Sequence, residues 1–596
     1  MEKFPSLVLG PNQEQIPDWR QISLAELCRF RSMVQPDLEI MSFLGDGIHE
    51  TETLTIERLD RQASHMAAWL SKVLPPSSKV MLLFENGPDY LIGLFGCAYA
   101  GMVAVSGVYP SDFGSRDRLN YIVKDSECSA ILGKKKVLEA FQSECLEVSQ
   151  EVFWIPVEIS ETYYKKVYNP SLDEDLALIQ YTSGSTQNPK GVILTNRNIL
   201  FNLLQQGQKF GYQKGDVGVS WLPLSHDMGL MGAALMAIGA GGKCVLLPPE
   251  TFLKDPSNWL RAISKYGATL SGGPAFAYQM CLNINEDTID SLDLSTWDQA
   301  FVGSESINRK VLEQFEVKFS KYRFKNLAFC PCYGLAEATL LVSAKERNLL
   351  PLFITVSREK LSEGYIVETE NLEDQRSIVS SGNLIDETQA VIVDSNMNIC
   401  SDRECGTIYL NGPSISSGYC GRFSKNIESF NYEGKLYIST GDKGFFINQN
   451  IYIIGRKDNE INVNGVLLDP EDIVFSVNEV EDKLSQRNCA VFQKTGRHES
   501  IVFVFGAANL EESVFTSIFR NIKNILCRKF KVSNGEIIAV SKSGIVRTPS
   551  GKVSMKKTQQ HLEDGRIDIV FRKEFSSHDN SSFHVRKMKT YERSSK

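Results

Sequence analysis

Hydroxyl-bearing residues, glycine and one lysine are concentrated in residues 178–191, which have the sequence LIQYTSGSTQNPKG. The residues of this loop that could contact phosphate are Thr182, Ser183, Gly184, Ser185, Thr186 and Lys190. Glycine lets the backbone approach an anion, hydroxyl groups donate hydrogen bonds and an ammonium adds positive charge, so the composition suits a polyphosphate. The spacing is not that of a Walker loop. The alternative is a surface turn that is merely rich in Ser, Thr and Gly.

A histidine and an aspartate stand together in residues 221–232, WLPLSHDMGLMG, ahead of an apolar stretch. His226 could be a gate for a substrate or a metal ligand, or it could be a helix cap with a packed imidazole. Two further glycine-containing segments, 271–278 (SGGPAFAY) and 301–307 (FVGSESI), are expected at strand ends. By themselves these two segments are weak signals of function.

An aromatic residue, a glycine and a carboxylate follow one another in residues 331–339, PCYGLAEAT. Tyr333 offers a ring face for a purine, and Gly334 offers a turn. Glu337 could hold Mg²⁺ against phosphate oxygens. The alternative is a helix start in which Glu337 is an ordinary solvated acid.

Two later segments add a carboxylate and a lysine. Asp442, in STGDKGFF, follows an expected strand, and its two oxygens could accept hydrogen bonds from both hydroxyls of a ribose. An isolated Thr-Gly-Asp is more often a turn. Lys552, in VRTPSGKV, follows a Ser-Gly pair, which is too common a pattern to indicate a function alone.

Alternating strand and helix patterns up to residue 300 predict a parallel sheet covered by helices, whose ligands lie beyond the carboxyl ends of the strands. One expected helix covers residues 52–73, and a strand follows at 80–84. Residues 91–110 contain no charge and approach the length of a membrane span, and residues 228–247 repeat their plan. Glycines divide each stretch into a helix and a strand, which favours two buried α/β units over two membrane spans.

The length of 596 residues predicts two to four folding units. A net charge of -8 argues against a generic nucleic-acid surface. The 13 cysteines are scattered, and Cys330 and Cys332 have no second pair to complete a zinc site, so we expect reduced thiols in a cytoplasmic protein. No integral membrane segment is expected.

The ordered set of motifs resembles the adenylate-forming superfamily, which includes acyl-CoA synthetases, peptide-synthetase adenylation domains and luciferases. HDMGL, SGGP and YGLAEAT are similar to the forms found in its fatty acyl-AMP ligases. The resemblance spans roughly residues 40–560. It implies an α/β fold with a large N-terminal adenylating domain of several subdomains over residues 1–457 and a small mobile α+β domain over 458–575. Residues 576–596 lack apolar periodicity, and we expect a disordered tail.

The resemblance also implies roles for individual residues. Those expected to bind the nucleotide are the loop residues named above together with Gly303, Ser304, Glu305, Tyr333, Gly334, Asp442 and Arg456. The expected catalytic residues are Lys552, His226 and Glu337, and Glu337 is also the expected magnesium ligand. The expected hinge is Asp458, although Asn462 stands where many relatives have a lysine. The candidates for the acyl pocket are Met228, Met231, Gly273 and Phe276, of which the apolar ones could equally be core residues.

Residues 345–376 resemble the insertion that distinguishes fatty acyl-AMP ligases from acyl-CoA synthetases, where it is held to hinder the domain motion or access that CoA needs. The implied reaction uses ATP and Mg²⁺ to convert a fatty acid into acyl-AMP. The acyl group then passes to the phosphopantetheine thiol of an acyl carrier protein, which must act in trans. The alternatives are a fatty acyl-CoA synthetase and a catalytically silent adenylate-binding protein.

Overall fold

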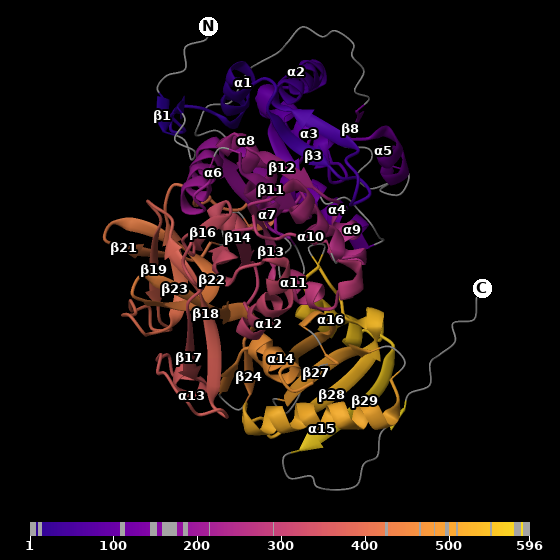
Figure 1. Cartoon of the computed structure of the whole chain (residues 1–596), viewed down its shortest axis with the longest axis vertical. Coiled ribbons are helices and arrows are strands. Elements are labelled where there is room, and N and C mark those ends of the chain that lie inside the picture. The colour runs from indigo at the N-terminus through magenta and orange to yellow at the C-terminus, as the bar shows by residue number, and fades with distance from the viewer. Residues whose placement is uncertain are drawn as a thin grey trace, which may run out of the picture.

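The chain folds into a large domain and a smaller C-terminal domain. In Figure 1 the large domain lies above and the smaller domain, in yellow, lies below. The structure is a computed structural model. It describes residues 7–9, 15–107, 114–142, 152–157, 176–182, 189–213, 215–289, 291–423, 427–463, 466–481, 483–484, 486–494, 500–507, 510–548, 551–576 and 586–587.

The first sheet of the large domain has six strands in the order β10-β9-β6-β5-β7-β8. Its strands are β5 (Lys79–Leu83), β6 (Val103–Ser106), β7 (Ala130–Gly133), β8 (Phe153–Pro156), β9 (Leu176–Tyr181) and β10 (Gly191–Thr195). Only the pair β9–β10 is antiparallel, and it flanks the predicted phosphate loop. The sequence therefore correctly predicted a strand on each side of that loop.

The second sheet has fifteen strands. They are β3 (Glu39–Phe43), β4 (Glu52–Thr55), β11 (Val217–Ser220), β12 (Lys243–Leu246), β13 (Leu270–Pro274), β14 (Gln299–Gly303), β15 (Phe329–Gly334), β16 (Leu341–Ala344), β17 (Phe353–Ser357), β18 (Gln375–Leu384), β19 (Gln389–Val393), β20 (Gly406–Asn411), β21 (Ser429–Tyr432), β22 (Lys435–Ile447) and β23 (Asn450–Arg456). Strands β3, β12, β11, β13, β14 and β15 are parallel to one another, whereas the pairing is antiparallel between β3 and β4 at one end and from β15 to β16 onward at the other. A short hairpin, β1 (Leu7–Leu9) with β2 (Gln15–Pro17), lies apart from both sheets.

The helices of the large domain follow the predicted alternation. They are α1 (Leu24–Val34), α2 (Ile56–Val73), α3 (Pro88–Tyr99), α4 (Gly114–Ser126), α5 (Lys135–Gln142), α6 (Asn196–Lys209), α7 (Asp227–Gly229), the π-helix η1 (Leu230–Leu235), α8 (Met236–Ala240), α9 (Pro249–Lys254), α10 (Ser257–Tyr266), α11 (Ala275–Leu282), α12 (Arg309–Phe319) and α13 (Arg358–Ser362). The short 3₁₀ turns are η2 (Glu286–Thr288), η3 (Ser320–Tyr322), η4 (Asn326–Ala328), η5 (Ala336–Ala338), η6 (Gly421–Phe423), η7 (Lys457–Asn459), η8 (Gln486–Asn488) and η9 (Lys542–Gly544).

The helix expected over residues 52–73 is shorter than predicted. Glu52–Thr55 pair as β4 with β3, and the Thr55 side chain then caps α2 by accepting a hydrogen bond from the backbone of Arg58. Val73, at the end of the predicted apolar face, is 46% exposed. The sequence analysis missed this strand because β4 is stabilised by pairing with β3, and the local helical pattern contains no information about that pairing.

Both charge-free stretches fold as buried α/β units where the structure describes them. Helix α3 leads into β6, and α8 ends at Gly241, whose φ of 68° is left-handed, before β12 begins. Among the described residues, we find no helix that combines the length and apolar character needed to span a bilayer.

The smaller domain has its own core and sheet. Its elements are β24 (Ile461–Val463), β25 (Val466–Leu468), α14 (Pro470–Asn478), β26 (Cys489–Lys494), β27 (Ser500–Ala507), α15 (Glu512–Arg528), β28 (Asn534–Ser541), α16 (Met555–Glu563), β29 (Ile569–Ser576) and β30 (Arg586–Lys587). A buried cluster running from Ile461 to Phe575 forms this core, and the predicted boundary at 457/458 falls in η7 just before it. Arg586 and Lys587 of the expected tail pair with β29 as β30. Residues 577–585 and 588–596 lie outside the described part.

Candidate active site

A cavity of about 930 Å³ lies between the two domains and brings together motifs that are far apart in the sequence. The predicted site residues that line it are Thr182, Lys190, His226, Phe276, Ser304, Glu305, Tyr333, Gly334, Glu337, Asp442, Arg456, Asp458 and Lys552. Several come from the end of a strand or from the segment that follows one, as expected for an α/β sheet, whereas Asp442 lies within β22. Ser183, Gly184, Ser185 and Thr186 lie outside the described residues.

A backbone hydrogen bond joins the two ends of the predicted phosphate loop. The N–H of Thr182 donates to the carbonyl of Lys190 over 3.0 Å, and Arg118 donates a second hydrogen bond of 3.0 Å to the carbonyl of Thr182. The ammonium of Lys190 lies 5.0 Å from the centre of the Tyr419 ring, within cation–π range. The lysine is therefore directed along the wall of the cavity.

Glu337 lies in η5 and points to the same tyrosine. The hydroxyl of Tyr419 donates to Oε1 of Glu337 over 2.6 Å, and the N–H of Ser416 donates to the carbonyl of Glu337 over 2.8 Å. Among the described residues, no cluster of three or more acidic, histidine or cysteine side chains could hold a metal. A single carboxylate still fits Mg²⁺, which commonly takes its other ligands from phosphates and water.

Tyr419 is a site residue that the sequence analysis missed. It lies in the loop between β20 and β21, within the sequence SSGYC, and is almost completely buried. Nothing in that local sequence separates it from an ordinary loop tyrosine. Its importance depends on Lys190 and Glu337, which reach it from distant parts of the chain.

Asp442 lies within β22, which runs past the strand expected before it, and is held there by two partners. The hydroxyl of Tyr333 donates to its Oδ2 over 2.6 Å, and Nε of Arg456 lies 3.2 Å from its Oδ1. Burial raises the pKa of Asp442 above its usual value, although Arg456 and Tyr333 oppose that shift. The three residues predicted to hold the nucleoside are therefore joined by one hydrogen bond and one ion pair.

Lys552 reaches across the domain interface to the loop after β14. Its Nζ donates over 2.7 Å to the carbonyl of Ser304 and also contacts the Ser304 hydroxyl. Ser304 has a φ of 70°, which is left-handed and uncommon for a residue other than glycine. Burial lowers the pKa of Lys552, while Glu305 and Asp227 act to raise it.

Glu305 faces Lys552 from the large domain. Its Oε1 accepts a hydrogen bond of 2.6 Å from the N–H of Phe276, at the start of α11. Burial raises the pKa of Glu305 to about 7, and Lys552 partly offsets this effect. An acid between Lys552 and α11 was not foreseen, because the resemblance placed Glu305 beside the adenine.

His226 begins α7 and lies against its neighbour, with Nδ1 2.5 Å from Oδ1 of Asp227. Burial would raise the pKa of Asp227, but His226, the backbone of Met228 and the charge of Lys552 outweigh it, and the pKa lies below its usual value. The imidazole and the carboxylate both line the cavity.

The residues predicted for the acyl pocket divide into two groups. Phe276 lines the cavity, with the Arg487 guanidinium 4.9 Å from its ring centre. Met228, Met231 and Gly273 are buried and do not appear in its wall. Gly303 is also absent from the wall, and a side chain there would meet the carbonyl of Cys332 at 2.6 Å.

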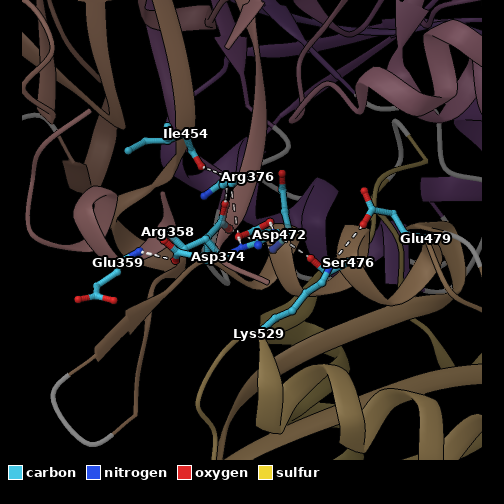
Figure 2. Close-up of polar contacts among 11 residues, drawn as sticks. Arg358, Glu359, Asp374, Arg376, Ile454, Asp472, Ser476, Glu479 and Lys529 are labelled. Carbon is cyan, nitrogen blue, oxygen red and sulfur yellow. Dashed lines mark hydrogen bonds and ion pairs between the residues drawn. The ribbon is translucent and has the colours of Figure 1, made fainter. Parts of the chain in front are cut away.

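The insertion folds as β17 and α13, and two of its arginines contact the small domain (Figure 2). Arg358 makes two hydrogen bonds, of 2.8 and 3.0 Å, to Asp472 in the first turn of α14. Arg376, at the start of β18, lies 2.6 Å from Asp469, the N-cap of α14. All four side chains are at most 14% exposed, so the insertion and the small domain are joined by buried ion pairs.

The fold and the cavity define an enzyme of the adenylate-forming class, in which the carboxylate of Asp442 and the ammonium of Lys552, from the second domain, line one cavity. The chain belongs to the family of AMP-binding enzymes, whose model matches residues 30–420. The chain is 30% identical over 572 residues to the medium-chain-fatty-acid–[acyl-carrier-protein] ligase JamA of Moorena producens, covering 92% of this chain and 96% of that protein.

Solved structures agree with this assignment. One from a study of fatty acyl-adenylate ligases from E. coli and L. pneumophila has a TM-score of 0.82 at 26% identity, covering 91% of this chain and 98% of that one. A second, the L. pneumophila fatty acyl-adenylate ligase with acyl adenylate and pyrophosphate, has a TM-score of 0.68 at 28% identity, covering 94% and 98%. The predicted fold class and the resemblance to fatty acyl-AMP ligases are confirmed.

Proposed function

We propose that this enzyme condenses a fatty acid with ATP to form acyl-AMP and pyrophosphate, and then transfers the acyl group to the phosphopantetheine thiol of an acyl carrier protein. The observation that carries the proposal is the contact between Lys552 of the small domain and Ser304 of the large domain, inside a cavity that also contains Lys190, Glu337 and Asp442. This arrangement corresponds to the closed state that adenylate formation needs.

A carboxylate attacks the α-phosphorus of ATP poorly because both groups are negatively charged. Catalysis must therefore come from positioning and charge neutralisation. In our proposal Lys552 neutralises the carboxylate and the charge that develops on the α-phosphate, Lys190 contacts the departing phosphates, and Asp442 orients the ribose. Glu337 would hold Mg²⁺, which neutralises phosphate charge when it is bound.

The choice of acceptor is supported by the insertion and by the relatives. Acyl transfer requires Lys552 to leave the cavity, so the small domain must rotate about the η7 region, where we place the hinge at Asp458. The ion pairs of Arg358 and Arg376 with the small domain oppose that rotation. The name of JamA, a medium-chain-fatty-acid–[acyl-carrier-protein] ligase, favours a carrier protein over CoA.

A fatty acyl-CoA synthetase is the second candidate, because the two kinds of enzyme share the adenylation step. A silent adenylate-binding protein is disfavoured because Lys190, Glu337, Asp442 and Lys552 are all present and line one cavity. The cysteines among the described residues are all free thiols, which supports a cytoplasmic location.

The test is mass spectrometry of the products formed by purified enzyme with ATP, Mg²⁺ and a series of fatty acids, with and without CoA. We expect acyl-AMP that CoA leaves unchanged and that a phosphopantetheine-bearing carrier protein consumes. Acyl-CoA formed at the expense of acyl-AMP would instead identify a synthetase. Failure to form any acyl-AMP would contradict the proposal as a whole.

A further inference from the structure

The imidazole of His226 is oriented by the carboxylate of Asp227. Their Nδ1 and Oδ1 atoms are 2.5 Å apart, and the two side chains are only 22% and 11% exposed. The N–H of Met228 lies 3.4 Å from Nδ1, but only 2.7 Å from Oδ1 of Asp227, which is therefore its better acceptor. In one tautomer Nδ1 accepts the Met228 N–H as a helix cap, but its lone pair would then face a carboxylate oxygen only 2.5 Å away. We therefore assign the proton of the neutral imidazole to Nδ1 and the lone pair to Nε2.

The backbone before His226 is fixed from two sides. The N–H of Leu224 donates to the Asn86 side chain over 2.8 Å, and the Gln180 side chain donates to the carbonyl of Ser225 over 2.7 Å. Gln180 belongs to β9, the strand that enters the phosphate loop. The histidine loop and the phosphate loop are thus tied to each other.

The chain after His226 is constrained as well. A side chain at Gly229 would lie 2.2 Å from the carbonyl of Pro223, so only glycine allows this close approach. The π-helix η1 follows at once, and π-helical segments are frequent at functional sites. Both features indicate that the His226 loop is a functional site rather than a simple helix cap.

Nε2 is the atom of His226 left for chemistry. Within the described ranges, no residue forms a hydrogen bond to Nε2, and the side chain lines the cavity together with Lys552 and Ser304. His226 belongs to the large domain, so it stays beside the reacting centre when the small domain withdraws Lys552. The second half-reaction then has a base available at the place where the thiol must arrive.

We propose that His226 is the general base that deprotonates the thiol during acyl transfer, with Asp227 as the positioning residue; this inference rests on the proposed function. The S–H proton passes to Nε2 while the sulfur forms a bond to the acyl carbonyl carbon. The bond from that carbon to the phosphate oxygen breaks, and AMP leaves with the electron pair. The imidazolium then releases its proton to water, so acyl-AMP and thiol give thioester, AMP and one proton.

The need for a base follows from the reactants. A thiol is a weak nucleophile until it is deprotonated, and its ordinary pKa of about 8.5 or above leaves little thiolate at neutral pH. AMP, in contrast, leaves as a stabilised phosphate anion and requires no acid. Removing the S–H proton is therefore the one proton transfer that the enzyme has to assist.

The experiment supplies synthetic acyl-AMP to excess enzyme, which bypasses the first half-reaction, and follows single-turnover transfer to a phosphopantetheine-bearing carrier protein. Hydroxylamine is the second nucleophile, because it attacks without prior loss of a proton. The variants are His226→Gln and Asp227→Asn. Matched controls are His49→Gln and Asp46→Asn, which alter an exposed pair with a Nδ1–Oδ2 distance of 2.7 Å. Thermal unfolding of each variant reports whether it is folded.

General-base catalysis contributes about 10²–10⁴-fold, so we expect His226→Gln to slow acyl transfer to the thiol at least about a hundredfold. The decrease in the rate of acyl transfer to hydroxylamine should be about tenfold smaller. The wild-type rate should level off as the pH rises, whereas the variant rate should keep rising toward the thiol pKa. Asp227→Asn should also slow acyl transfer to the thiol more than transfer to hydroxylamine, because the asparagine no longer stabilises the tautomer with its proton on Nδ1.

Equal losses with both nucleophiles, or a wild-type pH profile in folded His226→Gln, would overturn the assignment of the base while leaving the proposed function intact. If His226→Gln does not fold, an unselective effect of Asp227→Asn would overturn it. If the wild-type enzyme makes acyl-AMP from ATP but transfers nothing to the phosphopantetheine-bearing carrier protein, the acceptor half of the proposed function is wrong and this inference fails with it.

Discussion

The hydroxyl of Tyr419 donates a hydrogen bond of 2.6 Å to Oε1 of Glu337, and the face of the same ring lies 5.0 Å from the ammonium of Lys190. One side chain thus positions both the carboxylate that we propose for Mg²⁺ and the lysine of the phosphate loop. A tyrosine suits this task because its ring is rigid and its two ends offer different contacts.

Tyr419→Phe keeps the ring and removes the hydroxyl, so Lys190 retains its cation–π partner while Glu337 loses its donor. A hydrogen bond to a charged group contributes about 1.5–3 kcal/mol, and we expect the KM for Mg²⁺-ATP to rise about tenfold. Pyrophosphate release measured over a range of Mg²⁺-ATP concentrations checks this. Tyr266→Phe, which removes a surface hydroxyl 3.0 Å from Glu50, is the control. An unchanged KM would separate Tyr419 from metal and phosphate binding.

Lys552→Ala should lower the rate of acyl-AMP formation by about 10²–10³-fold, because it removes the charge that neutralises the carboxylate and the α-phosphate. ATP binding should stay within about threefold, since the nucleoside and phosphate contacts belong to the large domain. Calorimetric titration with ATP and a pyrophosphate-exchange assay give the two quantities. Lys542→Ala, an exposed change in the same domain, is the control. Unchanged turnover would remove Lys552 from the mechanism.

Arg358→Ala should loosen the small domain, because it leaves Asp472 buried with one fewer partner, and breaking a buried ion pair costs about 3–5 kcal/mol. We expect faster proteolysis near residues 457–460 and the appearance of acyl-CoA when CoA is supplied. Lys360→Ala, which breaks an exposed pair of the same insertion, should change neither.

Deleting residues 345–376 as a whole should also raise CoA thioester formation if the insertion opposes domain rotation. That deletion removes the buried side chains of Lys345 and Arg376 as well, so the point variant is the sharper test. Folded variants that still form no acyl-CoA would count against this role of the insertion.

Glu305→Gln should change how stability depends on pH. The pKa of Glu305 rises from 4.5 to about 7 in the folded protein, so the folded state binds more protons than the unfolded state between these values. Its contribution to stability is therefore full below about pH 4.5 and is lost as the pH rises through about 7. The variant lacks this loss, so its free energy of unfolding relative to wild type should rise over that range, by at most about 3 kcal/mol.

Urea unfolding at pH 5 and pH 8 measures the effect. Glu57→Gln, at an exposed position, should give parallel curves. A pH-independent difference between Glu305→Gln and wild type would show that Glu305 titrates normally.

The sequence alone determined the class of fold and most of the chemistry. The strands on each side of the phosphate loop follow from short apolar runs broken by glycine and hydroxyl residues, and β9 and β10 lie where these patterns place them. The motifs around His226, Glu337, Asp442 and Lys552 are individually common, and they could be interpreted only because together, in this order along the chain, they resemble the adenylate-forming superfamily.

Only the tertiary structure decided which partners these residues have. Tyr419 and Asp227 orient Glu337 and His226, but a loop tyrosine and a helix-starting aspartate carry no local signal of that role. Met231 proved to be core because burial depends on the helices and strands packed around it. The contacts of Arg358 and Arg376 with α14 join segments more than ninety residues apart, and such long-range pairing leaves no periodicity in either segment.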